Sequence, residues 1–244
     1  DRVLIDSFDL VIPCYNEAHV LENTIEEVVP FMHENFSFHW KIIIADNAST
    51  DDTFKIAKNL EKKYQNKVLA MHIPLKGRGL ALRNAWLTSD SEVCGYMDVD
   101  LSTDLVDLKK LIEPFNLGIA DIAYGSRLSP QSNTSRGWKR EIISRSYVFL
   151  LNFFVRLKVT DAQCGFKAIR TEVARDILPL VEDNGWFFDS ELLIIAQHNS
   201  MRMFEVPVTW EDDPDSRVDI FKTAMVDLKG IWRVLRGGIP KMYE

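Results

Sequence analysis

The feature that most constrains the fold is a regular alternation of short apolar runs with longer amphipathic stretches. The apolar runs predict strands over residues 8–13, 41–45, 68–73 and 93–97. The stretches between them predict helices that end near residue 36, cover residues 53–64 and end at residue 87. Strands that alternate with helices form a mostly parallel sheet with helices on both faces. The sequence therefore predicts an α/β fold.

The composition predicts one sizeable core, because 46% of the 244 residues are hydrophobic and 27% are charged. No linker rich in glycine, proline and serine divides the chain, so we expect one domain over residues 1–218 and an appended segment over residues 219–244. The net charge of −7 argues against a partner such as duplex nucleic acid, whose binding proteins carry a basic surface.

Cysteine usage and hydropathy predict where such a chain works. Cys14, Cys94 and Cys164 are far apart and odd in number, so neither a disulfide framework nor a zinc site is expected. The first ten residues contain three aspartates and no long apolar core, so we expect no signal peptide. No apolar run reaches the roughly 18 residues that cross a bilayer. We expect a reducing, cytosolic setting.

Two aspartates follow the fourth predicted strand. Asp98 and Asp100 stand where the apolar run ends, and carboxylates one residue apart can converge on one cation. Mg²⁺ or Mn²⁺ prefers oxygen ligands and keeps open positions for substrate phosphates. The alternative is helix capping, because residues 102–104 are Ser, Thr and Asp and precede the helical pattern that begins at residue 105.

Polar residues also follow the other predicted strands, where ligands bind in parallel sheets. The residues expected to line one crevice are Tyr15, Glu17, Asp46, Lys76, Asp98 and Asp100. A nucleotide fits such a set, because a carboxylate can accept from a base N–H, a tyrosine can pack on the base and a lysine can approach phosphate. Each residue also has a structural explanation, as a helix cap, a turn residue or a solvated loop residue. Neither the G-x-G-x-x-G nor the G-x-x-x-x-G-K-[ST] motif occurs.

Several motifs in a fixed order carry a family resemblance that covers residues 8–236. Residues 11–17, residues 46–51 and the Asp98-Val99-Asp100 triplet resemble the nucleotide-sugar half of a family 2 glycosyltransferase with the GT-A fold. Later motifs resemble the polyprenyl-phosphate glycosyltransferases, and among them the dolichyl-phosphate glucosyltransferase branch. These motifs are residues 125–127, 139–145, 161–167, 186–193 and 205–210.

The resemblance implies a nucleotide-sugar half over residues 8–104 and an acceptor half over residues 105–218. It implies that Asp98 and Asp100 hold Mg²⁺ or Mn²⁺ against the donor diphosphate. It places Asp46 on the base, and around base and ribose it places Pro13, Tyr15 and Glu17.

The sequence departs from the family pattern at three points. Ser102 stands where the mannosyl branch has a glutamine, so it is the third candidate metal ligand. Asn47 replaces the second acidic residue of the usual turn. Residues 76–79 read Lys-Gly-Arg-Gly, a variant of a loop rich in glycine and lysine, and leave open which cation approaches phosphate.

A lipid phosphate is itself a nucleophile with a charge of about −1.5 to −2, so an acceptor site mainly needs cations. The arginines in the later motifs are Arg127, Arg140, Arg145 and Arg217. The resemblance places Arg127, Arg145 and Arg217 near donor or acceptor phosphates, and pairing with surface acids is the alternative.

The motif over residues 161–167 is expected to be structural or to face the sugar, with Gln163 and Lys167 able to touch a ligand. A hydroxyl acceptor would instead require a general base, for which Asp189 or Glu191 is the candidate. Their position at the start of a helix also fits capping.

Two segments point to a membrane surface. Residues 142–157 are apolar on nearly all sides but too short to span a bilayer, and core burial is the alternative. Residues 219–236 form a basic amphipathic pattern with a tryptophan, which suits a membrane interface or packing on the domain. Related proteins often continue into transmembrane helices, so such a region outside this chain is an expectation too.

We therefore predict an inverting, metal-dependent transferase that moves a hexose, glucose first and mannose second, from UDP-glucose or GDP-mannose to polyprenyl phosphate at the cytoplasmic membrane face. Its predicted catalytic residues are Asp100, Arg127 and Asp189. The alternatives are a transferase acting on a saccharide or protein hydroxyl and a non-catalytic nucleotide-sugar-binding module. The sequence does not predict an oligomeric state.

Overall fold

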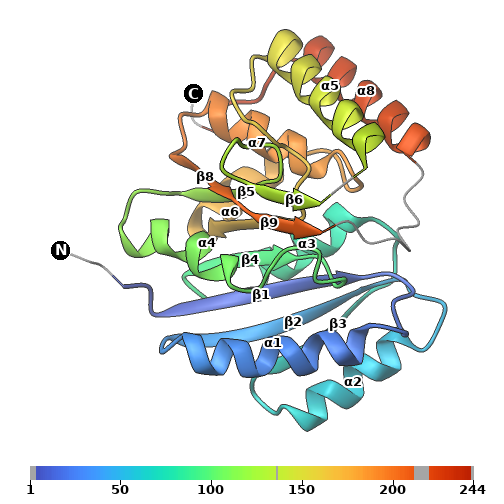
Figure 1. The fold of residues 1–244 in the computed structure, drawn as a ribbon, viewed down its shortest axis with the longest axis vertical. Helices are drawn as coiled ribbons and strands as arrows, with labels where there is room; N and C mark the ends of the chain where they lie inside the picture. The colour runs from blue at the N-terminus through green and yellow to red at the C-terminus, as the bar shows by residue number, and fades with distance from the viewer. Residues whose placement is uncertain (1–3, 136, 212–219, 243–244) are drawn as a thin grey trace.

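A seven-stranded sheet forms the centre of the molecule in the computed structural model, which describes residues 4–135, 137–211 and 220–242 (Figure 1). The strand order is β3-β2-β1-β4-β7-β5-β8. Neighbouring strands are parallel except at β7, which is antiparallel to both β4 and β5. The strands are β1 (Ser7–Cys14), β2 (His39–Asn47), β3 (Val68–Ile73), β4 (Val93–Met97), β5 (Ile122–Ser126), β7 (Phe166–Arg170) and β8 (Met203–Pro207). The predicted mostly parallel sheet is confirmed.

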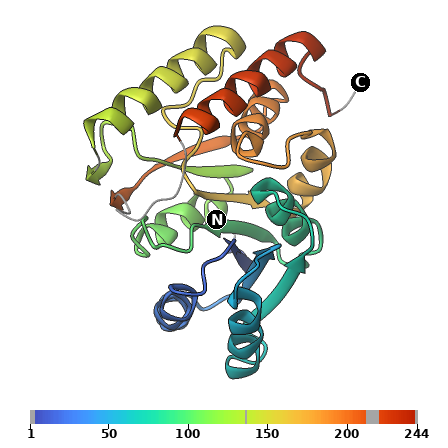
Figure 2. The same ribbon diagram turned by 90° about the vertical axis from the view of Figure 1, so that its right-hand side faces the viewer.

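Helices cover both faces of the sheet, as Figures 1 and 2 show. One face packs against α1 (Leu21–Asn35), α2 (Thr53–Lys63) and α4 (Asp107–Asn116). The other packs against α3 (Arg78–Leu87), α5 (Trp138–Val155), α6 (Thr171–Ile177), α7 (Phe188–His198) and α8 (Ile220–Gly237). Successive strand residues supply the two cores in turn: Leu10 and Ile12 belong to the first and Val11 to the second.

Short elements complete the acceptor half. The strands β6 (Asn133–Ser135) and β9 (Thr209–Glu211) pair with each other in parallel, and η1 (Leu178–Leu180) follows α6. Thr103, which follows β4 by six residues, bridges to Trp210 in β9. The helix after this stretch begins only at Asp107 and has no side-chain capping bond. Capping therefore does not account for Asp98 and Asp100.

Candidate active site

The loops after β1, β2 and β4 are held in an uncommon backbone conformation. Each contains a residue other than glycine with a positive φ: Asn16 at 54°, Ala48 at 56° and Leu101 at 54°. Such conformations are sparsely populated by L-residues and cluster at functional sites. Side chains fasten the first two loops together, because Asn16 Oδ1 accepts from the Thr50 N–H (2.8 Å) and the Glu17 N–H donates to Thr53 Oγ1 (2.9 Å).

Asp46, the next-to-last residue of β2, is a fully buried carboxylate. Its Oδ2 lies 2.7 Å from His72 Nδ1, whereas its Oδ1 has no hydrogen-bond partner among the described residues. A buried acceptor without a partner is unfavourable, and a ligand N–H would satisfy it. Since this oxygen is closed to solvent, a ligand reaches it only when a neighbouring side chain moves aside. Asp46 does not cap α2, which begins at Thr53.

Tyr15 and Lys76 meet beside this carboxylate's strand. The Lys76 ammonium lies 3.8 Å from the centre of the Tyr15 ring, and 37% of Tyr15 is exposed. Pro13 at the end of β1 and Glu17 in the loop after it are half-buried. An incoming base that stacks on Tyr15 would therefore compete with the Lys76 cation, which has phosphate as its alternative partner.

The loop over residues 76–79 is fixed between β2 and α7. Asn47, which replaces an acidic residue of the family turn, accepts from the Gly77 N–H at 2.9 Å. A Cβ at Gly77 would lie 2.5 Å from the carbonyl oxygen of Asn184, and one at Gly79 would lie 2.5 Å from Phe188 Cβ. Both glycines are therefore required by close packing, and they set the position of Arg78.

Asp98 directly follows β4, and Val99 and Asp100 belong to the turn after it, with Val99 buried. The Asp98 side chain is 40% exposed and Asp100 is exposed, with its Oδ1 accepting from the Ser102 N–H at 3.0 Å. The approach of the chain to Asp98 requires Gly165, where a Cβ would lie 1.7 Å from Asp98 Oδ2.

These two carboxylates fit a hard divalent cation that takes its other ligands from water and a diphosphate. Among the residues described, no group of three or more His, Cys, Asp or Glu side chains could hold a metal by itself. Ser102 is 9% exposed and its role as a third ligand stays a prediction.

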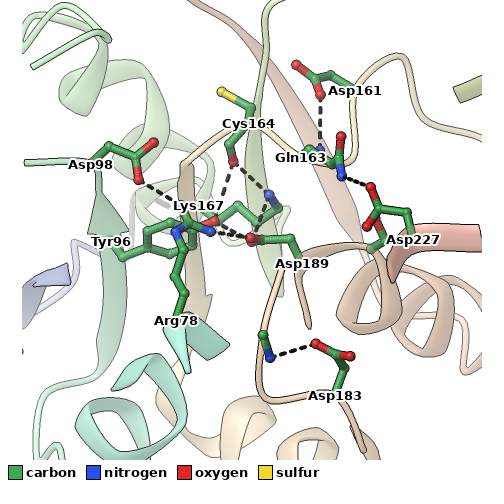
Figure 3. A network of polar contacts seen from close by, with 12 residues as sticks. Arg78, Tyr96, Asp98, Asp161, Gln163, Cys164, Lys167, Asp183, Asp189 and Asp227 are labelled. Carbon is green, nitrogen blue, oxygen red and sulfur yellow. Dashed lines mark hydrogen bonds and ion pairs between the residues drawn. The ribbon is translucent and has the colours of Figure 1, made fainter. Parts of the chain in front are cut away.

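Arg78 connects this carboxylate pair to the acceptor half (Figure 3). Its Nη2 donates to Asp98 Oδ1 at 2.7 Å and its Nη1 donates to Asp189 Oδ2 at 2.6 Å. Its guanidinium also lies 5.0 Å from the centre of the Tyr96 ring and 5.2 Å from that of Trp186. The sequence predicts a role for residues 76–79 but not the bridge that Arg78 forms, because the two carboxylates are 91 residues apart in the sequence.

Asp189 is a buried carboxylate that is engaged by three side chains. It accepts hydrogen bonds from Arg78 and from the Tyr96 hydroxyl, and it pairs with Lys167 Nζ at 3.0 Å. Tyr96 and Lys167 face each other across β4 and β7, which brings both to one carboxylate. Burial alone would raise the pKa of Asp189, but the charges of Lys167 and Arg78 lower it.

The position of Asp189 distinguishes between a helix cap and a general base. It lies in the first turn of α7, yet no side chain caps this helix. An ionised carboxylate with three donors is poorly placed to take a proton from a sugar hydroxyl. The geometry favours an electrostatic role, and catalysis by Asp189 stays a prediction. No sequence pattern predicts a role for Tyr96, because a tyrosine in an apolar strand is equally typical of a core residue.

The predicted acceptor cations have different surroundings. Arg127 forms a fork with the buried Asp161, with Nε–Oδ2 at 2.7 Å and Nη2–Oδ1 at 3.0 Å. Arg145 is exposed on α5 and pairs with Glu141 at 2.7 Å, and Arg140 is half-buried on the same helix. Arg217 lies outside the described residues.

The helices α5 and α8 lie side by side at one end of the molecule (Figures 1 and 2). Each buries one face and exposes apolar side chains on another. The exposed residues are Trp138, Ile142, Phe149 and Phe153 in α5 and Met225, Leu228, Trp232 and Leu235 in α8. The expected alternative of core burial is thus correct for only part of each helix. Of the helices described, none combines the length and apolar character needed to cross a bilayer.

Comparisons with known proteins agree with this architecture. Residues 9–178 match the family described as Glycosyl transferase family 2. Glycosyltransferase AglD of Haloferax volcanii is 37% identical over 87% of this chain, and the chain spans only 34% of the length of that protein. The dolichyl-phosphate beta-glucosyltransferase of Saccharomyces cerevisiae is 28% identical over 92% of this chain and 76% of its own length.

A similar fold occurs in glucosyl-3-phosphoglycerate synthase from Mycobacterium tuberculosis, solved in complex with Mn²⁺, UDP-glucose and phosphoglyceric acid. The TM-score is 0.70 at 17% identity, with 96% of this chain and 81% of that chain covered. At this identity the likeness establishes the fold, and the expected GT-A architecture is confirmed.

Proposed function

Because this chain belongs to glycosyl transferase family 2, we propose that it transfers a hexose from a nucleotide diphosphate sugar to a polyprenyl phosphate. Glucose is the first candidate for the sugar and mannose the second. The observation that carries the proposal is the junction at Asp98, which stands beside Asp100 on the donor side and is bonded through Arg78 to Asp189 on the acceptor side. The similarity to dolichyl-phosphate beta-glucosyltransferases supports the choice of sugar and acceptor.

The donor binds along the loops after β1, β2 and β4. Asp46 accepts the N–H of the base through its unpartnered Oδ1, Tyr15 packs against the base or ribose, and Lys76 turns toward the diphosphate. Asp98 and Asp100 would hold Mg²⁺ or Mn²⁺, which when bound stabilises the charge that develops on the leaving diphosphate. The complex of the structural neighbour with Mn²⁺ and UDP-glucose supports this pairing of ion and donor.

The acceptor needs no general base, because a phosphate monoester is already ionised at neutral pH. Its oxygen attacks the anomeric carbon from the face opposite the leaving diphosphate, which inverts the configuration. Arg127 and Arg145 supply positive charge, and Gln163 supplies a polar contact. The engagement of Asp189 by three donors supports a phosphate acceptor over a sugar hydroxyl, which would need a free base.

The exposed faces of α5 and α8 bring the enzyme to its lipid substrate. Amphipathic helices with aromatic residues bury their apolar side at the boundary between headgroups and acyl chains. Both helices expose a tryptophan, Trp138 at 69% and Trp232 at 61%. We assign this surface to the cytoplasmic face of a membrane, where the chain acts peripherally.

The test is transfer of radiolabel from UDP-glucose and, separately, GDP-mannose into polyprenyl phosphate in detergent or vesicles, with Mg²⁺ or Mn²⁺ and with EDTA. We expect metal-dependent label in the lipid phase with UDP-glucose as the better donor. Label in a water-soluble saccharide or protein instead would favour the hydroxyl acceptor. Donor binding without transfer to any acceptor would favour a non-catalytic module.

A further inference from the structure

Two side chains of α8, the buried Asp227 and the partly exposed Arg233, bond it to both segments that build the acceptor side of the site. Asp227 Oδ2 accepts from Gln163 Nε2 at 2.7 Å. Arg233 donates twice to Glu191, with Nη1–Oε1 at 3.0 Å and Nη2–Oε2 at 2.8 Å. Asp227 is 3% exposed and Glu191 is 2% exposed, whereas the Arg233 side chain is 35% exposed and also pairs with the exposed Glu182 at 3.0 Å. The two acceptor carboxylates are therefore buried, and Arg233 reaches Glu191 from the surface.

The bond to Glu191 reaches the first turn of α7. Glu191 lies two residues after Asp189, and it also accepts from the Asp183 N–H at 2.8 Å. The backbone of α8 approaches this turn closely at Gly230, where a Cβ would lie 2.4 Å from the ring of Phe187. Arg233 therefore fixes the helix start that presents Asp189 to Arg78.

The bond to Gln163 reaches the loop that contacts the carboxylate pair (Figure 3). In this loop the Gly165 carbonyl accepts from the Asp98 N–H at 3.2 Å, and Cys164 O accepts from Lys167 Nζ at 2.7 Å. The same loop provides Asp161, which holds Arg127. A shift of this loop therefore moves Asp98, Lys167 and Arg127 together.

The opposite side of the helix is exposed and apolar. Its buried side consists of Asp227, Gly230, Ile231 and Val234, and its exposed apolar side consists of Met225, Leu228, Trp232 and Leu235. Both sets repeat at intervals of three and four residues, so each forms a continuous stripe along the helix. One rigid element thus touches both the catalytic centre and the surface assigned to the membrane.

We propose that α8 is a positioning element of the active site. Asp227 and Arg233 keep the loop over residues 161–167 and the first turn of α7 in the arrangement that catalysis requires. Contact of the exposed side of α8 with lipid stabilises this arrangement. The lipid surface and the turnover rest on the proposed function. The bonds from α8 to Gln163 and Glu191 do not depend on it.

Asp227 is an unfavourable group if its only purpose is to pack a helix. Its Oδ1 is buried without a partner among the described residues, and burial raises its pKa to about 7. An apolar side chain would pack at this position without that penalty, so the carboxylate is better explained by the bond that it makes to Gln163.

The test compares Arg233→Met with Arg202→Met. Each variant removes one positive charge and a forked ion pair, but Arg202 pairs with Asp121 just before β5, at the edge of the sheet opposite the site. We measure transfer on phosphatidylcholine–phosphatidylglycerol vesicles that carry polyprenyl phosphate, at vesicle concentrations that bind all of the enzyme. Arg233→Met is expected to lower kcat by about fivefold or more with little change in donor KM, and Arg202→Met by less than about twofold.

Hydrogen exchange provides a second readout that needs no turnover. In Arg233→Met, amides over residues 161–167 and 187–192 are expected to exchange faster, and vesicles are expected to slow their exchange in the wild type but less in the variant. Asp227→Asn, which keeps an acceptor for Gln163, is expected to retain wild-type exchange in the loop, whereas Asp227→Leu is not.

Several results would overturn the proposal. One is an equal loss of kcat in both arginine variants, and another is unchanged kcat in Arg233→Met despite faster exchange. Exchange over residues 161–167 that is the same in the wild type and Asp227→Leu would exclude the link to the loop, and exchange over residues 187–192 that is the same in the wild type and Arg233→Met would exclude the link to α7. If the wild type transfers no sugar with any donor, the proposed function is wrong. Hydrogen exchange would still test whether α8 holds the two segments in place.

Discussion

The donor and acceptor halves of the site are built in different ways. Every predicted donor residue lies in the last two residues of a strand in the consecutive βα units β1 to β4 or in the stretch that follows it, so the parallel sheet alone brings these residues to one edge. The acceptor side instead depends on β7, an antiparallel strand inserted between β4 and β5, and on ion pairs between distant segments. The donor half is thus specified locally, whereas the acceptor half is specified by tertiary contacts.

This difference predicts that the largest loss comes from an exposed carboxylate that the proposed function assigns to the metal and the donor diphosphate. Asp100 is exposed, so Asp100→Ala is expected to reduce transfer by about a thousandfold through loss of metal and diphosphate, with the unfolding temperature changed by only about a degree. Calorimetry with UDP-glucose and Mn²⁺ measures the donor affinity. Unchanged metal-dependent affinity would remove Asp100 from the metal site.

Substitution of the residue that joins the halves should affect both activity and stability. Arg78→Lys keeps a charge but cannot bridge Asp98 and Asp189, so we expect kcat to fall about a hundredfold and stability to fall by about 2 kcal/mol. The matched control is Arg83→Lys in the same helix, because Arg83 donates to the carbonyl oxygens of Leu178 and Val181.

Arg83→Lys is expected to lower stability and leave kcat within about threefold of the wild type. Steady-state kinetics and thermal unfolding of both variants provide the comparison. Equal effects on kcat in the two variants would show that Arg78 acts through packing and does not couple the halves.

The same contrast explains which features of the fold and the site can be predicted from the sequence. The first four strands, the mostly parallel sheet and the positions of Asp46, Asp98 and Asp100 at strand ends follow from hydrophobic periodicity and from the rule that ligands bind at strand ends. The strands β5 to β9 were not predicted. The bridge formed by Arg78 did not follow, because no local pattern links a glycine-rich loop to a carboxylate in α7. The sequence likewise predicts Asp189 only as a base or a helix cap, because its three donors come from separate elements, α3, β4 and β7.

Asp227 supplies a pH-dependent test of the acceptor half. Gln163, Asp183 and Asp189 face it, and it lies near Tyr147 of α5. Burial raises the pKa of Asp227 to about 7, above an unfolded value of about 3.9. The folded state therefore binds the extra proton, and the stability that this carboxyl contributes is full below pH ~4 and is lost as pH rises through ~7.

We expect the unfolding temperature of the wild type to fall between pH 5 and pH 8 by several degrees more than that of Asp227→Asn. Differential scanning calorimetry in buffers of equal ionic strength measures both. Parallel pH dependence in the two proteins would mean that Asp227 is not protonated in the folded state at pH 5.

The smallest effect is expected from the exposed acceptor cation. Arg145 pairs only with Glu141 in the same helix among its described ion pairs, and such exposed pairs contribute about 0.3–0.5 kcal/mol to stability. Arg145→Ala should therefore leave the unfolding temperature nearly unchanged and raise the KM for polyprenyl phosphate about five- to tenfold, with donor KM unaffected. Glu141→Ala, which removes the partner and leaves the arginine, is the control and should not raise the acceptor KM. An effect of Arg145→Ala confined to donor KM would assign this arginine to the donor half, and the division of the site into two separately built halves would then be wrong at α5.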